Sequence, residues 1–219
     1  MSRVCCTLLI VATAACTTDG TGGTGPGPNE VVLSAQGGDG QSGLPSTVLT
    51  NPLRVRLVRG TQPQEGQTVT WLVAEGDGTL NTSSTTTDAS GHTQVVLTLG
   101  ADVGVTTVTA SVSGATGSPV TFSAFALVEG QAALVEVLNN FFQPAAVTIQ
   151  RNGVVIFNYP SSSQQHNILP TGGAVPNSPT VRNGPFVYEA TFPLTGTFGF
   201  YCSVHGTSTT GMRGTVVVQ

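Results

Sequence analysis

The segment that most constrains this chain runs from Gly196 to Val218 and reads GTFGFYCSVHGTSTTGMRGTVVV. Two apolar, strand-like runs flank a stretch rich in Gly, Thr and Ser, which predicts a strand, a loop and a returning strand. Cys202, His205 and Met212 lie within it. Each of these side chains can bind a soft or borderline metal ion, so one hairpin is predicted to deliver three ligands.

A fourth ligand is predicted at His166, which precedes Asn167 and lies between two apolar runs. A thiolate, two imidazoles and a distant thioether select copper, because sulfur suits the cuprous ion and imidazole suits both oxidation states. Alternation along β-strand residues 198–202 turns the Cys202 thiol toward a core. An isolated buried thiol is commonly a small hydrophobe. Here, however, a His and a Met follow it closely in a chain with only three His and two Met.

The segment resembles the C-terminal ligand loop of the cupredoxins, and FYCSVH with the later GM and GTVVV is most similar to plastocyanin-like members. The resemblance implies a Greek-key barrel over residues 131–219 that holds one type 1 copper. It also implies that Asn167 and Ser203 link the two ligand-bearing segments by hydrogen bonds and so orient the ligands. Tyr201 matches a tyrosine on one proposed electron route, with a barrel-surface aromatic as the equal alternative. His205 would be the partly exposed ligand.

Two features depart from the plastocyanin pattern. The six residues Gly206 to Gly211 separate His205 from Met212, a longer loop than that family has, which makes Met212 the least constrained ligand. Residues 131–219 contain only two acids, Glu136 and Glu189. The acidic docking patch of plastocyanins is therefore missing, and a photosynthetic partner is not supported.

The whole chain is predicted to be all-β, with a β-sandwich over residues 30–128. Short alternating runs such as Leu53–Leu57 and Val69–Val73 are separated by turns rich in Gly, Asp and Asn. Trp71, the only tryptophan, is predicted at the centre of this core. The region also resembles the bacterial immunoglobulin-like repeats of invasin-type proteins, on the motif residues Val69, Trp71, Gly76, Gly78, Leu80, Thr87, Asp88 and Gly91. For function this likeness is weak, since such modules serve as spacers and as adhesive units.

A second set of strands is predicted over residues 131–219. A strand begins near His166, and a long loop rich in Gly, Pro and Asn is expected from Thr171 to Pro185. The other predicted strands are Ala133–Val137, Ala146–Ile149, Val154–Tyr159, Phe186–Phe192, Thr197–Cys202 and Gly214–Val218. The number of strands alone would also fit another immunoglobulin-like domain.

Residues 1–16 predict a lipoprotein-type signal peptide, with Arg3, an apolar stretch and small residues before Cys16. Thr13 to Cys16 resembles a bacterial lipobox, which implies a lipid on Cys16 and an anchor in the cell envelope, on its periplasmic or cell-surface side. An ordinary secretory signal is the alternative. Residues 17–29 predict a flexible Gly/Thr/Pro tether. Processing would leave Cys202 as the only other thiol, and metal ligation is a reason to keep one.

Charge excludes one class of partner. Seven Lys and Arg face eleven Asp and Glu, a net charge of −4. Without a basic patch to displace counterions from phosphates, nucleic acid is not a predicted partner. His92 is predicted as a solvated turn residue. Glu75, Asp77 and Asp88 are predicted as soluble loop residues, with a calcium site as the alternative.

The predicted function is a one-electron carrier in the cell envelope, with the immunoglobulin-like domain as a spacer and an unidentified redox partner. Copper delivery or sequestration is an alternative that would use the same ligands. A surface adhesion or structural protein with an incidental copper site is another. A copper enzyme would need further histidines for a second site, and the chain has only His92, His166 and His205. The chain is therefore not predicted to be an enzyme.

Overall fold

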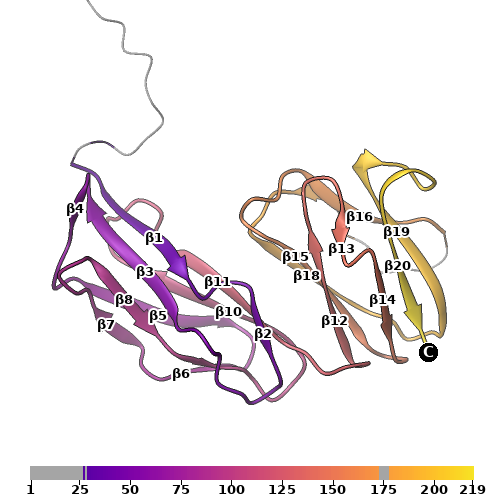
Figure 1. The fold of residues 1–219 in the computed structure, drawn as a ribbon, viewed down its shortest axis with the longest axis horizontal. Coiled ribbons are helices and arrows are strands. Elements are labelled where there is room, and N and C mark those ends of the chain that lie inside the picture. The colour runs from indigo at the N-terminus through magenta and orange to yellow at the C-terminus, as the bar shows by residue number, and fades with distance from the viewer. Residues whose placement is uncertain (1–26, 28, 173–177) are drawn as a thin grey trace, which may run out of the picture.

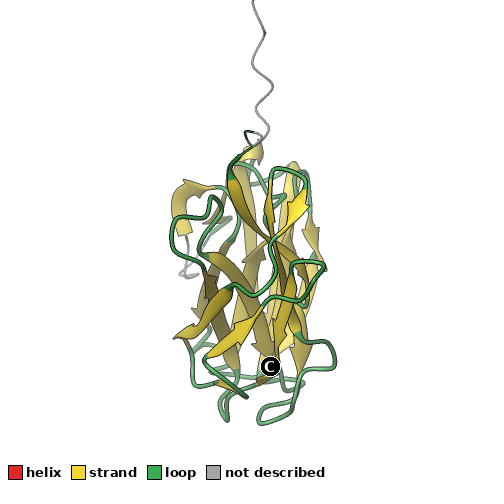
Figure 2. Ribbon diagram, turned by 90° about the vertical axis from the view of Figure 1, so that its left-hand side faces the viewer, coloured by secondary structure: helices red, strands yellow, loops and turns green. Residues whose placement is uncertain are grey.

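The computed structural model describes residues 27, 29–172 and 178–219. These residues form strands joined by turns and loops, which confirms the predicted all-β class (Figure 2). No helix occurs among them, and so none that is long and apolar enough to cross a membrane. The strands form two groups that lie side by side (Figure 1), and each group encloses a hydrophobic core of its own.

The first group is a sandwich of two principal sheets. One sheet has the order β1 (Val31–Gly37), β3 (Leu53–Arg59) and β4 (Gln62–Pro63), with β8 (His92–Val95) also paired to β3. The other has the order β2 (Gln41–Gly43), β11 (Val120–Ala126), β10 (Gly104–Ser111), β5 (Thr68–Glu75) and β7 (Ser84–Thr86). The short strands β6 (Thr79–Leu80) and β9 (Leu97–Thr98) form a separate pair.

Trp71 lies in the core of this sandwich, as its alternation with Val69 predicts. Trp71 is 2% exposed, and its ring centroid lies 6.1 Å from that of Phe122, a buried residue of β11. The indole N–H donates a hydrogen bond of 2.7 Å to Thr85 Oγ1, so the polar end of the ring is also satisfied.

The second group also consists of two sheets. The first sheet has the order β13 (Phe142–Gln143), β12 (Ala132–Val137), β15 (Val154–Tyr159) and β18 (Phe186–Thr191). The second has the order β14 (Ala146–Ile149), β20 (Gly211–Val218), β19 (Gly196–Gly206), β16 (His166–Pro170) and β17 (Ser178–Arg182). Edge-to-face aromatic contacts fill the space between them, with Phe200 centred 4.8 Å from Phe142 and 5.1 Å from Phe157.

Two strand boundaries and one whole strand in this group were predicted wrongly. β19 continues past Cys202 to Gly206, and β20 begins at Gly211 rather than at Gly214. The Gly- and Thr-rich composition of this stretch is typical of a loop and conceals the pairing. Likewise β17 lies within the predicted loop of residues 171–185. Four of its five residues are exposed, so it lacks the alternation by which a half-buried strand is recognised.

Candidate metal centre

The site is created by an interruption in the pairing of β19 with β20. The two strands pair up to Tyr201 and Arg213, and pairing resumes at Gly206 and Gly211. Between these two pairs, four residues of β19 lie opposite Met212 alone. These extra residues form a β-bulge, which bends β19 away from its partner strand and changes the direction of its side chains. Bulges are common beside functional sites.

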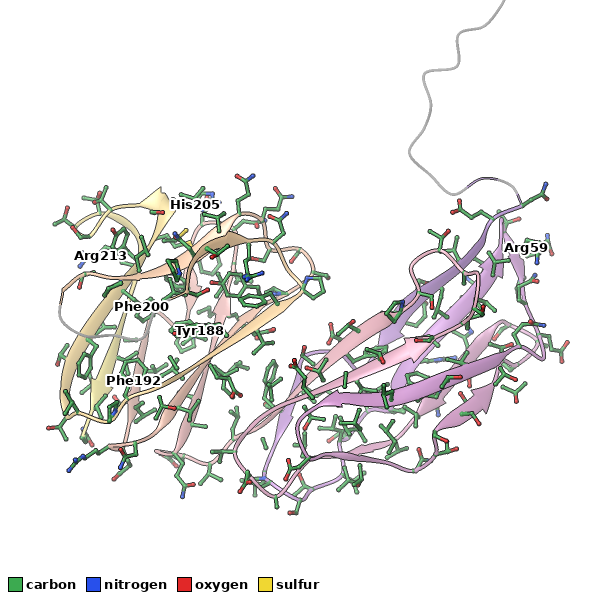
Figure 3. All side chains as sticks on the ribbon, turned by 180° about the vertical axis from the view of Figure 1, so that it is seen from behind. Arg59, Tyr188, Phe192, Phe200, His205 and Arg213 are labelled. Atoms are coloured by element: carbon green, nitrogen blue, oxygen red, sulfur yellow. The ribbon has the colours of Figure 1, made fainter. Side chains whose placement is uncertain are left out.

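Cys202 and His205 are the first and last residues of this bulge. Alternation along β19 turns Phe200 and Cys202 inward, and they are 1% and 0% exposed. The predicted inward orientation of the thiol is therefore confirmed. His205 is half-buried and lies at the end of the second group farthest from Phe192, together with Arg213 (Figure 3).

His166 is delivered by a separate strand. It is the first residue of β16, which is held against β19 by the pairs Leu169–Tyr201 and Pro170–Phe200. Its side chain is fully buried, at 0% exposure. Its ring centroid lies 4.6 Å from that of His205, so residues 39 positions apart in sequence meet at one point.

Three donor atoms converge there. Cys202 Sγ lies 3.5 Å from His166 Nδ1 and 3.8 Å from His205 Nδ1, and the two nitrogens are 3.2 Å apart. A triangle with these sides has a circumradius of about 2.0 Å, and its centre falls inside the triangle. Bonds from a first-row metal such as zinc to imidazole nitrogen and thiolate sulfur measure about 2.0–2.3 Å. One ion of that size therefore fits between the three atoms without any of them moving far.

Met212 is buried beside this set. It is 2% exposed and belongs to the same hydrophobic cluster as Cys202, on the strand opposite the bulge. If this thioether also bound the ion, the donors would be two nitrogens, one thiolate and one soft thioether sulfur. This donor set is the one that blue-copper sites use, with the thioether as a weak axial ligand.

Burial also prepares His166 for ligation. Desolvation lowers the pKa of His166 below its usual 6.5, and the nearby His205 lowers it further. Both effects favour the neutral imidazole, which is the form that binds metal. Its Nε2 atom is buried without a hydrogen-bond partner among the described residues, while Nδ1 faces the other two donors.

Hydrogen bonds join the two segments that carry the buried ligands. Ser203 N–H donates to Asn167 Oδ1 over 2.9 Å, and Asn167 Nδ2 donates to Ser203 Oγ over 3.0 Å. A longer bond of 3.3 Å runs from Asn167 Nδ2 to the Pro179 carbonyl oxygen. Because Asn167 follows His166 and Ser203 follows Cys202, these bonds fix the separation of two ligand-bearing strands.

Comparisons with known proteins add little to this description. No model of a known protein family matches the sequence, and no curated protein matches it either. Among solved structures, the chain is similar to a variant of amicyanin in its reduced Cu(I) form, with 23% identity over 42% of this chain and 86% of amicyanin and a TM-score of 0.35. It is similar to a fern plastocyanin mutant at 25% identity over 40% of this chain and 100% of the other, with a TM-score of 0.34. A purple cupredoxin from Nitrosopumilus maritimus is 24% identical over 40% of this chain and 99% of its own, also at 0.34. The function therefore has to be argued from the residues.

The other candidate residues lie outside this centre. Tyr201 is half-buried on β19 and faces Arg213 across the ladder, a position that leaves both of its interpretations open. His92 begins β8 and is half-buried, with its Nδ1 atom 2.8 Å from Ser90 Oγ. Within residues 27, 29–172 and 178–219, the only group of three or more His, Cys, Asp or Glu side chains placed to hold a metal is His166, Cys202 and His205. Glu75, Asp77 and Asp88 therefore do not come together as the alternative calcium site would require.

The predictions for the N-terminal region fall largely outside the described residues. The signal peptide of residues 1–16, the lipid-bearing Cys16 and all but two residues of the tether lie in the part of the chain that is not described.

Residues around the site that sequence reasoning missed include Arg213 and Thr207. Arg213 Nη1 donates a hydrogen bond of 2.9 Å to the Thr209 carbonyl oxygen, and Thr207 Oγ1 accepts from the N–H groups of Thr209 and Thr210. The pair of glycines at 206 and 211 around four hydroxyl residues is the one sequence signal that could have indicated a closed hairpin end.

Proposed function

We propose that residues 131–219 bind one copper ion through His166, Cys202, His205 and Met212 and that the protein is a one-electron carrier. The observation that supports this most is the convergence of Cys202 Sγ and two imidazole Nδ1 atoms within 3.2–3.8 Å of one another. The set of one thiolate, two imidazoles and a nearby thioether is the ligand set of blue-copper sites. Zinc sites in proteins are built from Cys, His, Asp and Glu side chains instead.

When bound, the copper would supply the chemistry by cycling between Cu(I) and Cu(II). The protein's part is to keep the ligands in place. Cys202 and His166 are fully buried on paired strands, and Asn167 ties their neighbours together. Ligands held in this way rearrange little between oxidation states, which favours fast transfer of an electron. With four protein ligands, the centre would offer no open position to a substrate, unlike catalytic metal sites.

His205 is the proposed point of electron exit. It is half-buried, whereas Cys202 and His166 are fully buried, so His205 is the histidine of the set nearest to solvent. Val204, its neighbour, is 41% exposed. A redox partner could therefore approach this edge of the site more closely than any other.

The setting of the carrier is also proposed. Cys16 would carry a lipid that anchors the protein in the cell envelope, residues 17–29 would act as a tether, and the immunoglobulin-like sandwich would be a spacer. These roles follow from the sequence patterns alone. Replacing Cys16 with Ser is expected to move the protein from the membrane fraction to the soluble fraction, as measured by fractionation of the producing cells.

The decisive measurement is visible absorption of the purified full-length protein during titration with cupric ion. We expect an intense blue band that saturates at one copper per chain and bleaches with a mild reductant. His166→Gln should abolish the band, while His92→Gln is the matched control that should leave it intact. The proposal would be contradicted if the unmodified protein developed no blue band and showed nothing more than the pale colour of loosely bound copper.

A further inference from the structure

The stretch between the last two ligands is an ordered extension of the hairpin. Residues 206–211, the hairpin tip, begin and end with the paired glycines Gly206 and Gly211. Thr207 N–H donates to the Thr210 carbonyl oxygen over 2.8 Å, and Thr207 Oγ1 accepts from the N–H groups of Thr209 and Thr210 over 3.2 and 3.1 Å. These bonds satisfy the backbone of the tip from within.

The hairpin tip lies directly on the backbone of two ligands. A Cβ atom on Gly211, whose φ is +80°, would lie 2.5 Å from the His205 carbonyl oxygen. A Cβ atom on Gly206 would lie 2.7 Å from the Met212 nitrogen. Real Cβ atoms do not come so close to backbone, so both positions require glycine. A displacement of the tip would therefore be transmitted to His205 and Met212.

One side chain ties this tip to the strand that carries Met212. Arg213 directly follows Met212, but it is exposed on the opposite face of β20. Its guanidinium Nη1 reaches back to the tip and donates a hydrogen bond of 2.9 Å to the Thr209 carbonyl oxygen. Arg213 thus links the start of the returning strand to a residue of the tip four positions earlier.

We infer that Arg213 is a positioning residue: by holding the hairpin tip against β20, it would fix the Met212 thioether relative to a copper ion held by His166, Cys202 and His205. This inference rests on the proposed function. A weak, long bond to a metal would not by itself fix a thioether, so the position of the Met212 side chain depends on the backbone that carries it.

The test compares Arg213→Gln with Arg151→Gln in the full-length protein loaded with copper. Arg151 is a matched control, because its Nε atom donates a hydrogen bond of 2.9 Å to the Pro193 carbonyl oxygen at the opposite end of the same domain. We expect Arg213→Gln to change the cupric hyperfine splitting and the ratio of the sulfur-to-copper absorption bands. Arg151→Gln should leave both unchanged, and Arg213→Lys should restore part of the native spectrum.

Two further readouts identify the cause. Loss of one hydrogen bond should speed amide exchange at Thr209 and Thr210 by roughly tenfold in Arg213→Gln. In addition, Arg213→Gln should have no spectral effect in a Met212→Leu background, because a residue that acts through Met212 has nothing left to position.

The outcomes separate this inference from the proposed function. A blue native protein whose spectrum is the same in Arg213→Gln overturns the inference alone, even if amide exchange is faster. An equal spectral change with and without Met212 also overturns it, since the effect would then come from the lost charge. A native protein that never becomes blue overturns the proposed function instead.

Discussion

Asn167 Oδ1 accepts a hydrogen bond of 2.9 Å from the N–H group of Ser203. The two residues are 36 positions apart in sequence, and each follows a buried ligand. The separation of the strands that carry His166 and Cys202 is therefore fixed by a side chain as well as by strand pairing. Asn167 is 3% exposed, whereas Ser203 is exposed, so the bond anchors a buried side chain to the backbone of a surface residue.

Replacing Asn167 with Ala is expected to weaken copper binding by about 10–100-fold, since residues that orient ligands commonly contribute that much. The free energy of unfolding of the metal-free protein should also fall, by about 0.5–1.5 kcal/mol, because the part-buried hydrogen bond from Ser203 N–H to Asn167 would be lost. Competition with a chelator measures the first effect, and denaturation measures the second. Asn139→Ala is the matched control, since Asn139 Oδ1 accepts the Gln164 N–H at an exposed position. Equal copper affinity in both variants would contradict this role.

Replacing Met212 with Leu tests the axial ligand separately from the other three. The two side chains have similar volumes, so the metal-free protein should lose less than about 1.5 kcal/mol of stability. The blue band should persist, because the thiolate and both imidazoles remain. The reduction potential should rise, because the loss of one donor destabilises the cupric ion more than the cuprous ion, which accepts fewer ligands. Voltammetry of the native and variant proteins checks this, and an unchanged potential would show that Met212 is not a ligand.

The sequence was sufficient to predict the elements that alternate. Trp71 and Val69 in the first core, and Phe200 and Cys202 in the second, are buried as their spacing predicts. The three donors could also be predicted, because His and Cys are scarce in this chain and follow one another at short intervals. In both cases the signal is local, since it depends on residues a few positions apart.

The parts that were missed depend on contacts between distant residues. The bulge that places Cys202 and His205 around one point arises from the register of β19 against β20, which composition does not reveal. The pairing of β17 with β16 was missed because β17 is mostly exposed. The bond from Arg213 to the hairpin tip was missed because it runs to a backbone carbonyl oxygen, which every residue type has.

Replacing Trp71 with Ala should destabilise the first core by about 3–5 kcal/mol, as expected when a large buried aromatic side chain is removed. The copper spectrum should not change, because the residues around the site belong to a separate hydrophobic cluster. Calorimetry of the copper-loaded protein would measure the loss of stability, and visible absorption during heating would follow the blue band as a marker of the second group of strands. Leu72→Ala is the control on the same strand, since Leu72 is 61% exposed and should cost no more than about 0.5 kcal/mol. Simultaneous loss of the blue band would mean that the two cores unfold as one.

Glu136 is expected to make the protein less stable as the pH rises. Burial raises the pKa of Glu136 above its usual 4.5, Asn158 opposes this by donating to both carboxylate oxygens over 3.1 and 3.0 Å, and the charge of Asp39 raises it further. The folded state therefore holds this proton more tightly than the unfolded state does. Below pH 4.5 the group is protonated in both states, and its destabilising effect develops as the pH rises from there through the raised pKa. Glu136→Gln should remove this loss of stability with rising pH, so the variant should become increasingly more stable than the native protein. Asn158→Ala should make the loss of stability with pH steeper, because the carboxylate would lose its hydrogen-bond donor. Unfolding temperatures measured across this range check the sign, and a constant difference between Glu136→Gln and the native protein would contradict it.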